Sequence, residues 1–168
     1  MKKINLFLRS FKNKNKGFTL IEILVVIGII AVLAAIVIVA INPAKQFAQA
    51  RNTQRTSNIE AILNAVGQRI ADNKGVFAGT FGAYTCPALT TPTARERIDS
   101  AGGGSGVNLS CLVPTYISAL PTDPDTTYAV SPYTGYEIEV NAAGRITVYA
   151  SKGQEAAFPG SEEISITR

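Results

Sequence analysis

KGFTLIEILVVIGIIAVLAAIVIVAI, residues Lys16 to Ile41, decides the fold of this 168-residue chain. The part from Phe18 to Ile41 has 24 residues, and Glu22 carries its only charge. A helix of that length reaches about 36 Å, more than the roughly 30 Å hydrocarbon core of a bilayer. The stretch therefore predicts a membrane-spanning helix with one carboxylate near its N-terminal end. Such a carboxylate is costly inside a membrane and usually has a partner.

The segment ahead of the apolar run is basic and has no acidic residue. Its six cations predict that the N-terminus stays cytoplasmic while the rest of the chain crosses the membrane. The apolar run is longer than that of a secretory signal peptide, which usually has about 7 to 15 residues. A simple uncleaved anchor explains neither Glu22 nor the abrupt junction at Gly17-Phe18. The cations are Lys2, Lys3, Arg9, Lys12, Lys14 and Lys16.

The heptapeptide from Lys16 to Glu22, KGFTLIE, resembles the N-terminal motif of type IV pilins and pseudopilins. Precursors in that family carry a short basic leader ending in glycine, then Phe-Thr-Leu-Ile-Glu and an apolar helix. The resemblance is strong over roughly residues 16–73 and weak beyond them. It implies that prepilin peptidase cuts between Gly17 and Phe18 on the cytoplasmic side and that Phe18 becomes N-methylated.

Cleavage at this junction would create a partner for Glu22. The new ammonium group of Phe18 would lie four residues from Glu22, about 6 Å along the helix axis. The family model pairs this glutamate with the N-terminal amine of a neighbouring subunit in the filament. Pairing in an apolar bundle is favourable, but the sequence does not choose between a neighbour's terminus and the chain's own. Attraction to the helix dipole is a weaker alternative, about 0.3 to 1 kcal/mol.

The basic character of the chain comes from its leader. The full chain has 16 basic and 12 acidic residues, a net charge of +4. Without the six leader cations it has 10 basic residues, and its net charge is near −2. We therefore expect no direct nucleic-acid binding, although a local basic patch around Arg51, Arg55 and Arg69 stays open.

A helical pattern continues past the apolar run and predicts a helix of about 56 residues in all. Pro43 interrupts it, because proline lacks the amide proton and crowds the carbonyl of Val39, so a kink is expected there. Asn73-Lys74-Gly75 supplies the stop. The apolar stripe consists of Ile59, Ile62, Leu63, Val66 and Ile70, and Gln54, Arg55, Asn58 and Arg69 are expected on other faces.

The remaining residues predict one small head, and the chain divides into four segments. These are a cleaved leader (1–17), the membrane and assembly half of the helix (18–41), its amphipathic half (42–74) and the head (75–168). Within the head, residues 75–135 hold six of the eight prolines and the glycine run 102–106. They predict irregular surface loops, with the glycine run flexible, because no Gly-Lys-Ser/Thr follows it as in a phosphate loop.

Cys86 and Cys111 are the only cysteines. If the head lies outside the cytoplasm, a disulfide between them is favoured over two buried free thiols. A structural zinc site is not expected, since the chain has no histidine and two cysteines alone do not make one.

Alternating residues in the last third of the chain predict a β-sheet. The patterns at 136–140 and 146–150 flank the turn 141–144 and predict an antiparallel hairpin. Ile164 and Ile166 suggest a further short strand, and 128–130 is another candidate. One apolar face of this sheet needs cover, which the helix stripe provides. The expected fold is α+β and pilin-like: a long N-terminal helix packed on an antiparallel sheet of three or four strands.

The segment Leu120 to Asp125, LPTDPD, followed by Gly135-Tyr136, looks similar to the calcium-binding loop of the major pseudopilins of type II secretion. That resemblance makes Asp123 and Asp125 candidate oxygen ligands. A polar turn beside prolines is the favoured interpretation of the same residues. We predict no metal and no cofactor.

No catalytic arrangement is recognisable, and the chain has no histidine, so an enzyme is not expected. The favoured hypothesis is a type IV pilus subunit for adhesion, motility or DNA uptake. Its partners would be prepilin peptidase, identical subunits, a membrane assembly platform and a cytoplasmic ATPase. It would sit in the inner membrane as a single-pass protein before assembly, then in a surface pilus. The alternatives are a pseudopilin in an envelope pseudopilus and a membrane-anchored binding module that never polymerises.

Overall fold

The structure, a computed structural model, describes residues 17–89, 95–150 and 163–168. It forms two compact units, Met1–Asn42 and Pro43–Arg168. The six leader cations lie outside the described residues. Both the long apolar helix and the α+β character expected from the sequence are confirmed.

The described part of the first unit, residues 17–42, contains helix α1 (Leu20–Ile41), and no residue of this helix is buried. By its length and composition, α1 is long and apolar enough to cross a membrane. It ends at Asn42, whose φ of 48° and ψ of 81° lie in the left-handed region. The interruption expected at Pro43 thus falls one residue earlier. Pro43 is the first residue of the next helix, where its missing amide proton costs no hydrogen bond.

Helix α2 (Pro43–Asp72) begins the second unit and supplies one side of the core. The predicted apolar stripe is confirmed, since Ile59, Ile62, Leu63 and Val66 are buried. The predicted stop is confirmed too: the amide of Gly75 donates to the carbonyl of Ile70 at 2.8 Å.

Polar residues on α2 depart from the prediction. Arg55, Asn58 and Arg69, expected on other faces of the helix, are buried on the same side as the apolar stripe. Partners of all three lie in loops and strands that follow α2 in the chain, so helix periodicity alone does not reveal them. The basic patch that the sequence left open around Arg51, Arg55 and Arg69 does not form, because Arg55 and Arg69 are buried.

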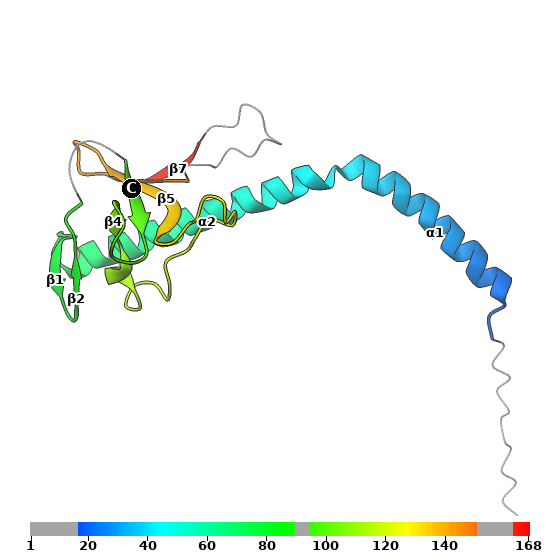
Figure 1. Ribbon diagram of the computed structural model, residues 1–168, viewed down its shortest axis with the longest axis horizontal. Helices are drawn as coiled ribbons and strands as arrows, with labels where there is room; N and C mark the ends of the chain where they lie inside the picture. Colours follow the sequence, from blue (N-terminus) through cyan, green and yellow to red (C-terminus); the bar gives the residue numbers. More distant parts are fainter. Residues whose placement is uncertain (1–16, 90–94, 151–162) are drawn as a thin grey trace, which may run out of the picture. The chain divides into compact units, whose positions relative to one another are not determined.

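A five-stranded sheet lies along the C-terminal half of α2 (Figure 1) and is in contact with it through β6 and β7. The strand order is β4-β3-β5-β6-β7. The pairs are antiparallel except β3 with β4, which is parallel. The strands are β3 (Glu96–Asp99), β4 (Val107–Asn108), β5 (Tyr133–Val140), β6 (Ile146–Ala150) and β7 (Ile164–Thr167).

The predicted hairpin is the centre of this sheet. Strands β5 and β6 pair from Tyr136 opposite Ala150 to Val140 opposite Ile146, and the strand expected around Ile164 is β7. The strand expected at 128–130 does not form, since these residues lie in a turn and irregular backbone. The sheet also exceeds the expected size, because β3 and β4 come from the region predicted to be irregular.

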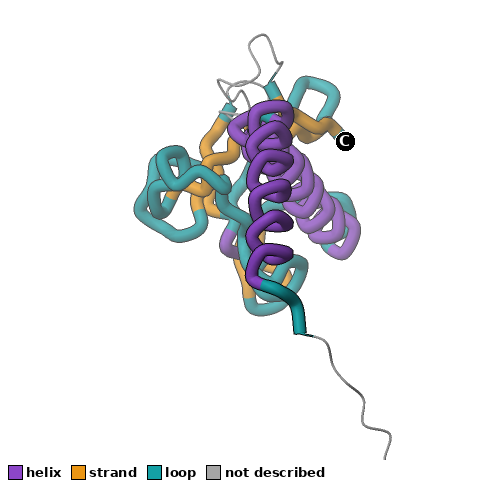
Figure 2. The backbone as a smooth tube through the Cα atoms, turned by 90° about the vertical axis from the view of Figure 1, so that its right-hand side faces the viewer, coloured by secondary structure: helices purple, strands orange, loops and turns teal. Residues whose placement is uncertain are grey.

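The same region holds a short 3-10 helix, η1 (Ser110–Leu112), and a separate hairpin of β1 (Gly79–Phe81) and β2 (Tyr84–Cys86). Figure 2 shows how much of the head is loop (teal) around the strands (orange). Two glycines of the glycine run, Gly104 and Gly106, approach β3 closely, although residues 102–105 are exposed. A Cβ at Gly104 would overlap the carboxylate of Asp99, and the amide of Gly106 donates to that carboxylate at 2.9 Å. These glycines let the chain return close to β3.

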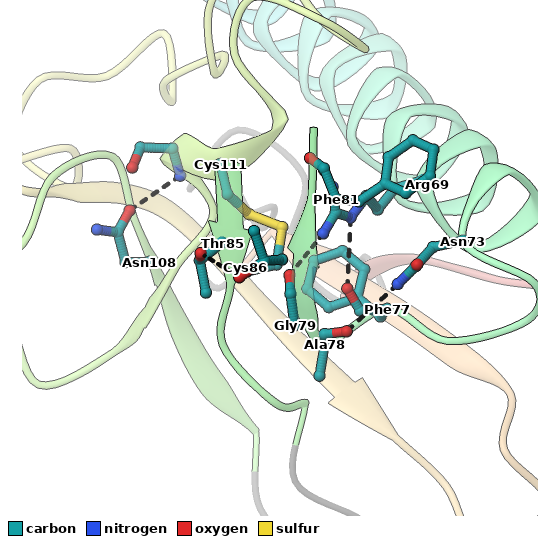
Figure 3. Close-up of a disulfide and its surroundings, with 12 residues drawn as sticks. Arg69, Asn73, Phe77, Ala78, Gly79, Phe81, Thr85, Cys86, Asn108 and Cys111 are labelled. Carbon is teal, nitrogen blue, oxygen red and sulfur yellow. Dashed lines mark hydrogen bonds between the residues drawn. A yellow bond between two sulfur atoms is a disulfide. The ribbon is translucent and has the colours of Figure 1, made fainter. Parts of the chain in front are cut away.

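A disulfide joins Cys86 at the end of β2 to Cys111 in η1, and both cysteines are buried (Figure 3). It closes a loop with a sequence separation of 25 residues. It therefore ties the β1–β2 hairpin to the segment that leads into the long loop before β5.

The double variant Cys86→Ala/Cys111→Ala should lower the free energy of unfolding by about 3.5 kcal/mol, the chain-entropy value for such a loop. Urea unfolding of the full chain in a non-ionic detergent, followed by circular dichroism, measures the difference. Wild type kept under reducing conditions should behave like the variant. Coincident unfolding curves for oxidised wild type and variant would contradict the prediction.

Candidate functional site

The Gly17–Phe18 peptide bond precedes α1 in exposed, non-helical backbone. The side chain of Phe18 is 83% exposed. A Cβ built on Gly17 would meet nothing within 4 Å. No described residue covers this bond, and nothing within the described chain requires glycine at position 17.

Thr19 and Glu22 form a capping box at the start of α1. The amide and the hydroxyl of Thr19 each donate to Oε2 of Glu22 at 2.8 Å. In return, the amide of Glu22 donates to the Thr19 hydroxyl at 3.3 Å. The box satisfies amide groups that have no partner within the helix and fixes the carboxylate at the first turn.

This arrangement does not depend on the leader. The donating amide of Thr19 belongs to the Phe18–Thr19 bond, one bond beyond the junction, so the predicted cleavage between Gly17 and Phe18 would leave these hydrogen-bonding groups in place. Thr19 is a positioning residue that the sequence interpretation missed. The pattern Thr-x-x-Glu before an apolar run is a readable signal for it.

The second polar cluster lies in the head, where α2 meets the loop before β5. Arg55, 0% exposed, forms a bidentate ion pair with Asp123, which is 3% exposed. Its Nε donates to Oδ2 at 2.8 Å and its Nη2 to Oδ1 at 2.9 Å. Beside this pair, the amide group of Asn58 donates to the carbonyl of Thr122 at 3.1 Å and to the hydroxyl of Tyr136 at 2.8 Å. The cluster fastens the loop to the helix.

The residues of this loop do not fit the calcium site suggested by resemblance. Both carboxylate oxygens of Asp123 accept from the guanidinium of Arg55. The carboxylate of Asp125 accepts from the amide of Thr127 at 3.0 Å, within its own turn. Across the described ranges, no group of three or more His, Cys, Asp or Glu residues could hold a metal ion.

Arg69 is buried against the β1–β2 hairpin (Figure 3). Its guanidinium donates to the carbonyls of Phe77, Gly79 and Phe81, the shortest contact being 2.7 Å to Gly79. It also lies 5.4 Å from the centre of the Phe81 ring. Three carbonyls of alternate residues thus accept hydrogen bonds from one side chain. Arg69 anchors the β1 end of the hairpin to α2, whereas the disulfide holds the β2 end.

Burial raises the pKa of Tyr136 to about 12, against 10.0 for a free tyrosine. The hydrogen bond from Asn58 opposes this shift, and the charge of Asp123 adds to it. The folded state therefore holds this proton more tightly than the unfolded state. The contribution to stability is complete below about pH 10 and is lost as the pH rises toward about 12.

Between about pH 10 and about pH 12, we expect the free energy of unfolding of wild type to fall by about 2 to 3 kcal/mol, because Tyr136 loses its proton more readily in the unfolded state. Tyr136→Phe should not show this alkaline decrease in stability. Tyr84→Phe, which changes an exposed tyrosine, should show the same decrease as wild type. Urea unfolding of the three proteins at a series of alkaline pH values measures the effect. Parallel pH profiles for wild type and Tyr136→Phe would refute it.

Residues 12–38 match a family model described as the prokaryotic N-terminal methylation motif. The matched residues include Gly17, Phe18 and Glu22 as well as the capping Thr19. The head lies outside the match. No curated protein and no solved structure matches the chain.

Proposed function

We propose that this chain, which carries the prepilin-like cleavage and methylation motif of type IV pilins and pseudopilins, is the subunit of a type IV pilus. Prepilin peptidase would cut it between Gly17 and Phe18, Phe18 would be N-methylated, and the mature chain would polymerise through its apolar helix. The filament would serve adhesion, motility or DNA uptake. The observation that carries the proposal is a carboxylate, Glu22, on an apolar helix that begins next to an accessible cleavage point.

Helix α1 supports assembly because no described residue of the first unit covers its apolar surface. None of its 22 residues is buried, and a large exposed apolar surface indicates a membrane or another protein. A bilayer would cover this surface before assembly. The apolar helices of identical subunits would cover it in a filament. Before assembly we place the chain in the inner membrane as a single-pass protein with a cytoplasmic N-terminus, served by an assembly platform and a cytoplasmic ATPase.

Glu22 supports an ordered assembly rather than a simple anchor. A lone carboxylate in an apolar bundle is unfavourable, and an ammonium group within reach neutralises it. Cleavage would supply that group at Phe18. The capping box with Thr19 holds the carboxylate at the helix start, at the same end as the new terminus. We propose that Glu22 of an incoming subunit pairs with the amine of Phe18 in a neighbouring one.

A pseudopilin of type II secretion remains the alternative within the family. The feature that favoured it was the calcium loop, and Asp123 is paired with Arg55 instead. We therefore rank the pilus subunit first. A non-polymerising anchored module is the other alternative, and the adjacency of Glu22 to the junction argues against it.

Replacing Gly17 tests the processing step. Gly17→Val should leave the chain at its full-length mass in the membrane fraction, because the peptidase, rather than the fold, requires glycine there. Gly67→Ala is a matched control, since Gly67 is exposed and a Cβ there also meets nothing within 4 Å. It should be cleaved like wild type. Intact-mass measurement decides, and a cleaved Gly17→Val chain would sink the proposed processing.

A further inference from the structure

We infer that the guanidinium of Arg55 serves as the built-in cation of the loop between η1 and β5, so that this head folds without calcium. The loop comprises residues 113–132, between Leu112 at the end of η1 and Tyr133 at the start of β5. This holds for the head whether or not the chain polymerises.

The loop holds the carboxylate of Asp123 in the interior of the head. The amide of Asp123 donates to the carbonyl of Thr134 at 2.8 Å. Gly135 has a φ of +90°, and a Cβ there would lie 2.6 Å from the Cβ of Asp123. The close approach of these two backbone segments buries the Asp123 side chain. A buried carboxylate requires a positive partner or several hydrogen-bond donors.

Arg55 meets that requirement from 68 residues away in the sequence. Its planar guanidinium faces the carboxylate with two parallel hydrogen bonds, the geometry that makes arginine suited to buried pairs. Its Nη1 donates to the side-chain carbonyl of Asn52 at 3.0 Å. The amide of Asp125 adds a further donor to Oδ1 of Asp123 at 2.8 Å. Both carboxylate oxygens of Asp123 thus accept hydrogen bonds from within the chain, and its charge is paired with that of Arg55.

Calcium would have to displace these contacts. It takes about six to eight oxygen ligands at roughly 2.3 to 2.6 Å. At Asp123 both oxygens already face N–H groups, and a cation placed there would lie against the positive charge of Arg55. The ion pair between Arg55 and Asp123 is part of the folded chain and does not depend on any ligand. Stabilisation by a bound ion, in contrast, varies with the concentration of that ion. The stability of this head should therefore not follow the calcium level around it.

Thermal unfolding of the full chain in non-ionic detergent tests this, in millimolar calcium and in excess chelator. The melting temperature of wild type should be the same in both. Arg55→Gln should melt lower in both, with an unfolded fraction at least about a hundredfold larger at a given temperature below melting, because the carboxylate stays buried and loses its cation. Arg145→Gln, which removes an exposed cation from the β5–β6 turn, should match wild type.

A melting temperature of wild type that rises with calcium would overturn the inference, since it would show a metal bound with Arg55 in place. An Arg55→Gln chain as stable as wild type would overturn it as well. If that variant does not accumulate as a folded protein, the wild-type comparison decides alone. Neither result depends on cleavage or on filament formation. Cleavage is measured by the intact mass of the chain, and filament formation by the amount of protein in sheared surface fractions.

Discussion

Glu22→Ala should be cleaved like wild type and yet be absent from sheared filaments. The junction at Gly17–Phe18 lies in exposed backbone ahead of the helix, so removing the carboxylate leaves the cleaved bond accessible. In the filament, the amine of a neighbouring Phe18 would be left without its partner in an apolar bundle. Breaking a buried ion pair in this way costs about 3 to 5 kcal/mol, which corresponds to a reduction in assembled subunit of at least about a hundredfold.

Immunoblots of sheared surface fractions against membrane fractions measure this reduction. Glu60→Gln is the matched control, because Glu60 is an exposed acidic residue on α2 and should assemble normally. Wild-type amounts of Glu22→Ala in long fibres would show that the carboxylate has no part in assembly. A variant that stays at full-length mass would instead place Glu22 in recognition by the peptidase.

The Arg55–Asp123 pair should produce the largest stability effect in the head. Arg55→Met should lower the free energy of unfolding by about 3 to 5 kcal/mol, because it leaves the Asp123 carboxylate buried and unpaired. The double variant Arg55→Met/Asp123→Leu removes both charges and should lie much closer to wild type. Well-packed apolar groups can replace a buried ion pair at little cost.

Urea unfolding of wild type, both single variants and the double variant completes a double-mutant cycle for this pair. The sum of the two single effects should exceed the effect of the double variant by more than about 1 kcal/mol. Additive effects would mean that the two residues stabilise the head independently. That result would contradict a stabilising role for the two hydrogen bonds between them.

The features that the sequence predicted correctly follow from the periodic spacing of neighbouring apolar residues. The apolar run gives α1, the stripe from Ile59 to Val66 gives the buried face of α2, and alternation gives the β5–β6 hairpin. Each follows from a pattern of neighbouring residues and needs no knowledge of the rest of the chain. The N-terminal motif is also local, since Gly17, Phe18 and Glu22 lie within the matched residues; the roles of these three residues stay predictions.

The features that were missed depend on contacts between distant residues. Arg55 and Arg69 were expected on other faces of the helix, but residues that follow later in the chain bury them and accept their hydrogen bonds. Strand β3 has only four residues and β4 only two, and both are defined by their pairing. They lie among glycines and prolines, where local signals favour loops. The position of Asp123 against Gly135 likewise arises only when β5 is in place.

The central claim is that the chain is cleaved after Gly17 and assembles into a filament. The most direct measurement is the N-terminal residue and intact mass of the protein in sheared surface fibres. We predict a mature chain that begins at N-methylated Phe18 and is recovered in long fibres. The same mature chain confined to the envelope would favour the pseudopilin, and a chain that still begins at Met1 would contradict the account.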